Sequence, residues 1–180
     1  MDFQELTDLV KAHFPQYTIE ADMRNPQPAL LIPASGIADI CAFLHADPRL
    51  FFDFLACITA IDNGPEKGTM ELIYNMTSIP YGRDLVLKMV FARNEAGTPL
   101  PAIPTVSHIW RTADWHEREI FDLMGIAFTG HPDLRRILLP EDWDGHPLRR
   151  DYAVEGRYHG IYIRFEDGTT QERVSSEDRR

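Results

Sequence analysis

Residues 52–92, FDFLACITAIDNGPEKGTMELIYNMTSIPYGRDLVLKMVFA, decide the fold because they hold three apolar runs separated by turn residues. The runs cover residues 52–61, 69–77 and 85–92. Asn63-Gly64-Pro65 follows the first run and Ile79-Pro80-Tyr81-Gly82 follows the second, and such residues favour turns. Between Met70 and Met76 the apolar side chains fall on alternate positions, as in a strand with one buried face. The stretch therefore predicts an antiparallel meander of three strands.

The residues before this meander predict two helices and two short strands. Apolar residues recur at helical spacing over residues 3–14, and Pro15 ends the pattern. Residues 17–23 and 28–33 have the length and composition of short strands, and Ser35 is a candidate N-cap for a second helix. Helices and strands without βαβ alternation are typical of an α+β protein.

The residues after the meander predict a linker, a third helix and an irregular extension. Residues 97–104 contain three prolines, and the helix is expected over residues 112–124, with Gly125 suited to its C-terminal cap. We expect a two-layer α+β domain with helices packed on a mixed or antiparallel sheet, an irregular extension rich in arginine and aromatic residues, and a polar tail. These three parts cover residues 1–124, 125–154 and 155–180.

Composition excludes several classes of function. The net charge of −10 argues against binding to nucleic acid or to anionic lipid. No apolar stretch reaches the length of a membrane span, and the acidic N-terminus does not resemble a signal peptide, so we expect a cytoplasmic location. Cys41 and Cys57, each among apolar neighbours, are too few for a four-thiolate cluster and are expected to be buried thiols.

Residues 114–152, DWHEREIFDLMGIAFTGHPDLRRILLPEDWDGHPLRRDY, combine many charges with aromatic and aliphatic residues. Arginine beside aromatic residues, with Gly and Pro between them, is typical of a surface buried against a protein partner. The pairs Arg135-Arg136 and Arg149-Arg150 lie close to acidic residues in the sequence. They predict either an internal network that makes the segment rigid or an interface in which Trp143, Tyr152 and Leu138-Leu139 supply contact area.

The third helix carries two kinds of charged position. Asp114, Arg118 and Asp122 are spaced four apart, so one arginine can serve two acids along one helix face. That face is either an exposed ladder of ion pairs or a surface buried against a partner. Asp114 and Glu117 also fit a capping box. Glu117 lies on an apolar stripe with Phe121, so it needs a partner, and we expect a buried ion pair or a contact with another chain.

Evidence for a catalytic site is weak. His116-Glu117 does not begin an HExxH motif because residue 120 is Ile. His131 and His146 both occur as Gly-His-Pro, and a shared metal is conceivable. Local hydrogen bonding that holds a turn is the better interpretation of both.

Part of the segment resembles a known family. The residues Glu117-Arg118-Glu119, Asp122-Leu123, His131, Arg135 and Ile137-Leu138, followed by GHPDLRRILLPEDWDGHPLRRDY over 130–152, are similar to the signature of the C subunit of NADH-quinone oxidoreductase, the 30 kDa subunit family of respiratory complex I. The match is strong over 114–152 and loose over 1–110.

The resemblance implies a structural subunit of the peripheral, quinone-reducing arm of a complex that moves electrons from NADH to quinone and couples this to ion translocation. It implies no catalytic, cofactor or metal residue in this chain, with flavin and iron–sulfur clusters in partner subunits. The D subunit is the expected neighbour, followed by the B and I subunits, on the cytoplasmic face of the plasma membrane. The alternatives are the equivalent subunit of a membrane-bound hydrogenase or ferredoxin-dependent relative and, more remotely, a stand-alone metal-dependent hydrolase.

Twelve residues are candidates for contact with partner subunits. They are Glu117, Arg118, Glu119, Asp122, His131, Arg135, Arg136, Trp143, His146, Arg149, Arg150 and Tyr152.

Overall fold

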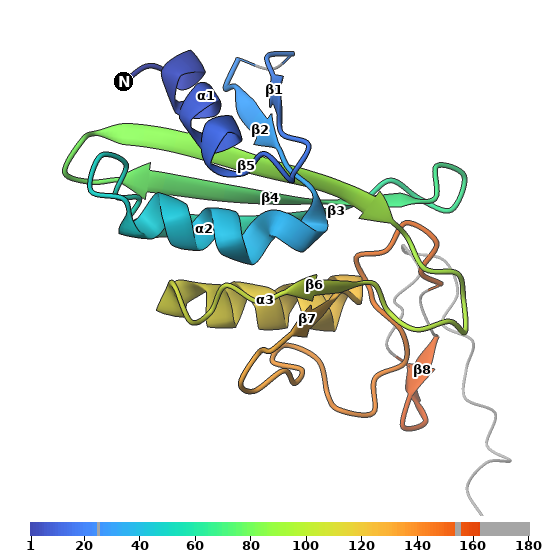
Figure 1. Ribbon diagram of the computed structural model, residues 1–180. Coiled ribbons are helices and arrows are strands. Elements are labelled where there is room, and N and C mark those ends of the chain that lie inside the picture. Colours follow the sequence, from blue (N-terminus) through green and yellow to red (C-terminus); the bar gives the residue numbers. More distant parts are fainter. Residues whose placement is uncertain (25, 154–155, 163–180) are drawn as a thin grey trace, which may run out of the picture.

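The structure is a computed structural model that describes residues 1–24, 26–153 and 156–162. Its centre is a five-stranded mixed sheet with strand order β1-β2-β5-β4-β3 (Figure 1). The strands are β1 Glu20–Asp22, β2 Ala29–Leu31, β3 Phe54–Asp62, β4 Thr69–Ser78 and β5 Arg83–Ala92. β3, β4 and β5 form the predicted antiparallel meander, whereas β2 pairs with β5 in parallel. The α+β class predicted from the sequence is confirmed.

One face of the sheet forms the core. Along β4 the buried residues Met70, Leu72, Tyr74 and Met76 alternate with half-buried ones, as the sequence pattern predicted. All four belong to a single hydrophobic cluster that also contains residues of every helix. Because successive side chains of a strand point to opposite faces, the helices bury one face of the sheet and leave the other face without them.

Three helices make the second layer: α1 Phe3–His13, α2 Ile37–Ala46 and α3 Arg111–Met124. In Figure 1, α1 lies beside β1 and β2, α2 runs along the sheet, and α3 lies below the β3 edge. The expected N-cap of α2 is wrong: Ser35 lies inside the 3-10 helix η1, Ala34–Gly36, and Gly36 begins α2 without a side-chain cap. Within the described residues, no helix is both long enough and apolar enough to cross a membrane.

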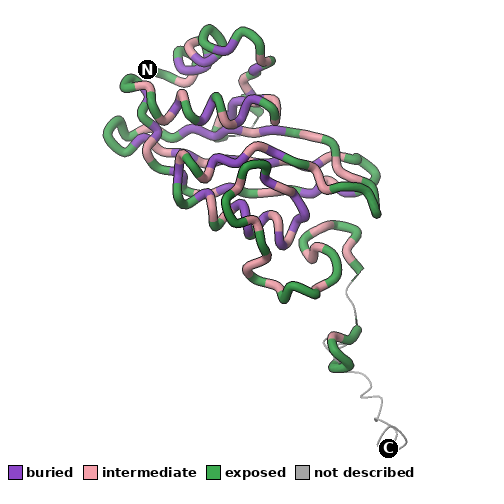
Figure 2. Tube along the Cα trace, turned by 60° about the horizontal axis from the view of Figure 1, so that its bottom comes forward, coloured by how far each residue is buried: buried purple, intermediate pink, exposed green. Residues whose placement is uncertain are grey.

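The predicted linker and the start of the predicted extension each contain a short strand, and the two strands form a second sheet. β6 Ala102–Pro104 pairs in parallel with β7 Ala127–Thr129, so the chain on either side of α3 is joined by backbone hydrogen bonds. The three prolines of residues 97–104 favoured a linker there, and three residues carry too little periodicity to overrule that interpretation. Residues 130–153 contain no helix or strand, and in Figure 2 they are coloured as a mixture of half-buried and exposed residues.

The described part of the predicted polar tail forms a hairpin. β8 Arg157–Tyr158 and β9 Ile161–Tyr162 form a short antiparallel hairpin. The Tyr158 hydroxyl donates to Asp142 Oδ1 at 2.6 Å, which ties the hairpin to the extension. Residues 155 and 163–180 of the predicted tail lie outside the described residues.

The two cysteines differ in their surroundings. Cys41 is buried in α2, as expected, whereas Cys57 is only half-buried, next to a bulge in β3. The Cys57 Sγ accepts a hydrogen bond from Asn75 Nδ2 at 3.3 Å. The prediction of two buried thiols is therefore right for Cys41 alone.

Candidate functional site

Helix α3 begins where the chain is tied to the sheet. Trp110 is its N-cap, and the indole N–H donates to the Phe52 carbonyl at 3.1 Å. Thr112 Oγ1 donates to the carbonyl of Leu55 at 3.3 Å. The predicted capping box is wrong, because Asp114 and Glu117 both lie inside the helix rather than at its boundary.

Glu117 is fully buried on the core side of α3. Its Oε1 accepts from the Val106 backbone N–H at 2.8 Å, and its Oε2 is in a short hydrogen bond with the Thr105 hydroxyl. Burial raises the pKa of Glu117 to about 7, although these two hydrogen bonds lower it, and the nearby Asp114 raises it further. The expected partner therefore exists inside this chain, and it consists of neutral groups rather than a cation.

Asp122, five residues further along α3, is the anchor of the extension. Its Oδ2 accepts three consecutive backbone N–H groups, those of Ile137, Leu138 and Leu139, at 3.0, 2.8 and 2.9 Å. Its Oδ1 accepts from Arg136 Nη1 at 2.8 Å. Burial alone would raise the pKa of Asp122, but the four donors outweigh it and hold the pKa below its ordinary value.

Arg118 does not bridge Asp114 and Asp122, so the exposed-ladder alternative is wrong. Arg118 is only 7% exposed, its guanidinium lies 5.2 Å from the ring centre of Trp115, and its Nε donates to the Arg135 carbonyl at 3.3 Å. This contact ties the extension to α3. Glu119, the next residue, is exposed.

The C-terminal end of α3 is covered by the extension. Gly125 has φ +65°, as predicted for a C-terminal cap, and His146 Nδ1 lies 2.9 Å from the Asp122 carbonyl. Arg149 donates from Nε to the Met124 carbonyl and from Nη2 to the Gly125 carbonyl, both at 2.8 Å. A guanidinium at this position also complements the negative end of the helix dipole. Burial lowers the pKa of His146, so its neutral ring uses Nδ1–H as the donor to the carbonyl.

Gly125 is required by this packing. A Cβ at this position would lie 2.4 Å from His146 Cδ2 and 2.7 Å from Arg149 Nη2, closer than carbon atoms tolerate. The positive φ and the close approach thus both favour glycine.

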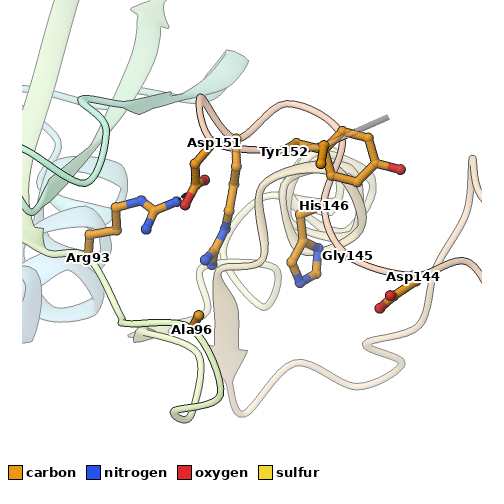
Figure 3. Close-up of a pocket in the computed structure, with 9 residues that line it drawn as sticks. Arg93, Ala96, Asp144, Gly145, His146, Asp151 and Tyr152 are labelled. Carbon is orange, nitrogen blue, oxygen red and sulfur yellow. Dashed lines mark hydrogen bonds and ion pairs between the residues drawn. The ribbon is translucent and has the colours of Figure 1, made fainter. Parts of the chain in front are cut away.

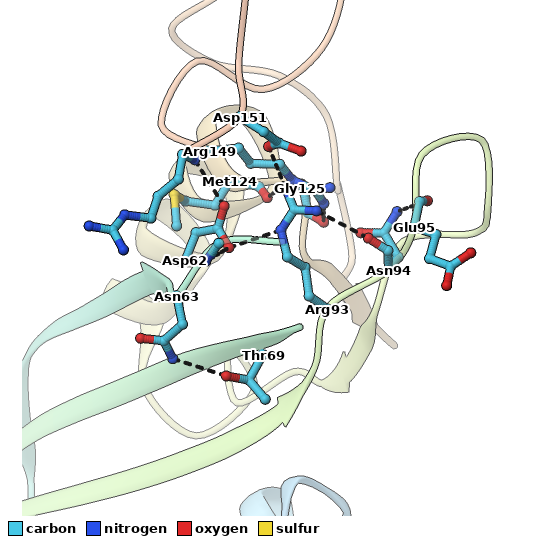
Figure 4. Close-up of polar contacts among 12 residues, drawn as sticks. Asp62, Asn63, Thr69, Arg93, Asn94, Glu95, Met124, Gly125, Arg149 and Asp151 are labelled. Atoms are coloured by element: carbon cyan, nitrogen blue, oxygen red, sulfur yellow. Dashed lines mark hydrogen bonds and ion pairs between the residues drawn. The ribbon is translucent and has the colours of Figure 1, made fainter. Parts of the chain in front are cut away.

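A buried ion pair joins the extension to the main sheet. Arg93, at the end of β5, lies between Asp62 and Asp151 (Figure 4), with its Nε 2.9 Å from Asp62 Oδ1. Asp62 Oδ2 also accepts from the Arg150 backbone N–H at 2.9 Å. Sequence analysis missed Asp62 and Arg93, since no local pattern pairs residues from distant strands.

A pocket of about 310 Å³ opens beside this pair. Figure 3 shows Arg93 and Asp151 on one side of it, with His146, Tyr152 and Asp144 on the other. Acids and cations are mixed around it, so its electrostatic character favours neither anions nor cations.

Trp143 and Tyr152, the aromatic candidates, form hydrogen bonds within the chain, as does Arg136. Arg136 Nη2 donates to the carbonyls of Trp143 and Gly145 at 3.0 and 3.1 Å, and Trp143 Nε1 donates to the Tyr152 hydroxyl at 3.0 Å. Arg136 and Arg149 therefore follow the internal-network interpretation. Arg135, paired with Asp133 at 2.9 Å, keeps 66% of its side chain exposed, and Arg150 is also exposed.

His131 and His146 do not come together. His131 Nε2 lies 3.4 Å from Asp114 Oδ1, near the start of α3, and its Nδ1 accepts from the Asp133 N–H at 3.1 Å in a local turn, as predicted. His146 binds the Asp122 carbonyl, eight residues along the helix, or ~12 Å at 1.5 Å per residue. One metal ion cannot be held by both rings. Across the part of the chain that the structure describes, no group of three His, Cys, Asp or Glu side chains could hold a metal ion.

The fold and this site define a class: a two-layer α+β protein whose last helix carries an extension fixed by arginines and one buried aspartate. The family model for the respiratory-chain NADH dehydrogenase 30 kDa subunit matches residues 30–158. The chain belongs to this family.

Two relatives, both named as the C subunit of NADH-quinone oxidoreductase, illustrate the similarity. The protein from Chloroherpeton thalassium is 46% identical over 126 residues, which cover 70% of this chain and 50% of the relative. The protein from Chlorobium phaeobacteroides is 36% identical over 160 residues, 88% of this chain and 93% of the relative. The chain thus spans half of one relative and nearly all of the other.

A solved structure shares the fold. A chain of the membrane-bound sulfane sulfur reductase, an archaeal respiratory membrane complex, superposes with a TM-score of 0.66 at 23% identity. The match covers 83% of this chain and 85% of that chain.

Proposed function

We propose that this chain is a structural subunit of the peripheral, quinone-reducing arm of NADH-quinone oxidoreductase, without a catalytic site of its own. The complex transfers electrons from NADH to quinone and couples this to ion translocation. One observation carries the proposal. Asp122, Arg136 and Arg149, charged residues of the segment that resembles the family, bind backbone groups of their own chain. Side chains so engaged build a rigid surface rather than a reactive centre. The names of the relatives favour the NADH-linked complex over the hydrogenase-linked alternative.

The cofactors of the complex belong, in this proposal, to the partner subunits. Burial raises the pKa of the Cys41 thiol, which keeps it protonated, and the thiolate is the form that binds metals. Cys57 lies on a different element and is engaged with Asn75. The purified chain should be colourless and free of stoichiometric iron, zinc and flavin, and any of these in the isolated protein would oppose the proposal.

The α3–extension surface, defined by Trp115, Leu138 and Leu148, is the proposed contact with partners. These side chains are 64%, 60% and 58% exposed, although they are large and apolar. Their backbone is held firmly: Leu138 N–H binds Asp122, and Leu148 N–H binds the Leu123 carbonyl at 3.0 Å. Exposed apolar side chains on a rigid backbone lose little conformational entropy on binding. We propose the D subunit as the first partner, then the B and I subunits, on the cytoplasmic face of the membrane.

Co-expression with the D, B and I subunits tests this surface. Leu138→Asp and Trp115→Ala should reduce recovery of the assembled subcomplex at least ten-fold, as expected for central contact residues. Ile79→Asp is the matched control, since Ile79 is 63% exposed but lies in the β4–β5 turn, and it should leave assembly unchanged. Equal recovery of the subcomplex with all three variants would show that the interface lies on another surface.

A further inference from the structure

The core of this protein contains a carboxyl group whose surroundings suit a bound proton. Glu117 is fully buried, and its two oxygens contact the Thr105 hydroxyl and the Val106 N–H. Among the described residues, the basic group paired with it is His131 Nε2, at 3.8 Å from Oε2, which forms an ion pair only when the ring is protonated. Neither the family relationship nor the proposed structural role assigns a task to a buried carboxyl group here.

The Thr105 hydroxyl links this carboxyl to the surface. Thr105 Oγ1 lies 2.8 Å from Ser107 Oγ as well as against Glu117 Oε2, and Ser107 is half-buried, within reach of solvent. Thr105 Oγ1 also accepts from the Ser107 backbone N–H at 3.1 Å. A hydroxyl has a single hydrogen, so Thr105 can donate to Glu117 or to Ser107 but not to both.

This ambiguity disappears if the hydrogen-bond direction follows the protonation of Glu117. With an ionised Glu117, Thr105 donates to Oε2 and accepts from the Ser107 hydroxyl. With a protonated Glu117, the carboxyl donates to Thr105, which donates in turn to Ser107. Every hydroxyl and carboxyl oxygen keeps a partner in both states, so the same geometry accommodates both.

We propose that Glu117 is a proton-binding site connected to solvent through the hydroxyls of Thr105 and Ser107. For uptake, a hydronium ion gives a proton to Ser107 Oγ, the Ser107 hydrogen moves to Thr105 Oγ1, and the Thr105 hydrogen moves to Glu117 Oε2. One water molecule remains, and Glu117 becomes neutral. Release runs through the same atoms in reverse.

The other groups around Glu117 are consistent with this route. Asp114, on the same helix, opposes the ionised form of Glu117, and burial raises the pKa of Glu117 to about 7. Cys41 of α2 and Tyr74 of β4 lie close enough for the charge of Glu117 to raise the pKa of each, so both face it as neutral groups. Arg118 directs its guanidinium to Trp115 instead.

His131 offers no competing route. Its Nδ1 accepts from the Asp133 N–H, and its Nε2 faces the carbonyl and the carboxyl of Asp114. The distance of 3.8 Å from Nε2 to Glu117 Oε2 exceeds that of a hydrogen bond.

Infrared spectroscopy of the full chain tests the proposal. The C=O stretch of a protonated carboxyl, assigned by its loss in Glu117→Gln, should be strong at about pH 6, half lost near pH 7, where the pKa of Glu117 lies, and nearly absent above about pH 8. Ser107→Ala should leave this midpoint nearly unchanged but slow proton exchange with water, measured by a pH jump, at least ten-fold. Ser107→Thr restores the hydroxyl and should restore the rate.

Thr105→Val removes a hydrogen bond that stabilises the carboxylate, so the midpoint should rise. Because Thr105 is buried and this variant can unfold, the half-buried Ser107 gives the decisive comparison. A carboxyl that titrates in the ordinary range of glutamate would overturn the proton site. Equal exchange rates in wild type and Ser107→Ala would overturn the relay.

Discussion

Replacing Gly125 by alanine tests the contact between α3 and the extension most directly. The new Cβ would lie 2.4 Å from His146 Cδ2 and 2.7 Å from Arg149 Nη2, so both side chains must move. Gly68→Ala is a matched control, because Gly68 has φ +61°, close to the +65° of Gly125, and nothing lies within 4 Å of its Cβ position. The difference between the two variants therefore isolates the steric effect from the backbone effect.

The magnitudes follow from the groups displaced. A left-handed conformation costs an L-residue roughly 1–2 kcal/mol, which both variants share. At Gly125 the displaced side chains also lose one neutral hydrogen bond, from His146, and two charged ones, from Arg149. At ~1 kcal/mol for the first and ~1.5 kcal/mol or more for each of the others, Gly125→Ala should be less stable than Gly68→Ala by about 4 kcal/mol.

Urea denaturation measures the global part of this loss, and amide hydrogen exchange measures the local part. The Leu148 N–H, which donates to the Leu123 carbonyl at 3.0 Å, should exchange much faster in Gly125→Ala and at the wild-type rate in Gly68→Ala. A stability difference below ~1 kcal/mol, with Leu148 equally protected in both variants, would refute the claim that His146 and Arg149 hold the extension on α3.

Two further substitutions separate buried from exposed charges. Asp122→Ala removes the acceptor of three N–H groups and of Arg136, and should cost ~3–5 kcal/mol, whereas Asp133→Ala, in an exposed pair, should cost under ~1 kcal/mol. Similar urea midpoints for the two would contradict this. For Glu117 the pKa in the folded protein, about 7, lies above the ordinary value of 4.5. The protonated group therefore adds to the free energy of unfolding, in full below pH 4.5. This contribution, about 3 kcal/mol, is lost as the pH rises to about 7. Glu117→Gln should remove this dependence of the free energy of unfolding on pH. Parallel curves of stability against pH for wild type and variant would contradict the prediction.

The elements that could be predicted from the sequence are those with long periodic patterns. Two examples are the alternation from Met70 to Met76 and the helical pattern that ends at Gly125. Each pattern is long enough for the spacing of its apolar residues to indicate which side is buried. β6 and β7 were not predicted, because their pairing joins residues 25 apart, as between Ala102 and Ala127, and the prolines around β6 favoured a linker.

The predictions for α3 failed where spacing was taken as evidence of partners. Asp114, Arg118 and Asp122 do recur at intervals of four, but competing donors decide which contacts form. The extension presents three N–H groups and a guanidinium to Asp122, which leaves Arg118 to contact Trp115 and the Arg135 carbonyl. The start of the helix is likewise set from outside it, by the bond from Trp110 to the Phe52 carbonyl.

Glu117 and Asp122 show how far two carboxylic acids can diverge within one helix. Both carboxyls are fully buried, so desolvation raises the pKa of each. Asp122 receives four donors, one of them a cation, and its pKa falls below the ordinary range. Glu117 receives one amide and one hydroxyl, which is too little to offset burial, and its pKa rises. The first carboxyl is therefore an anion at neutral pH that holds the extension, and the charge of the second changes near neutral pH. That distinction arises from loops folded against the helix from either side, and the helix sequence alone does not contain it.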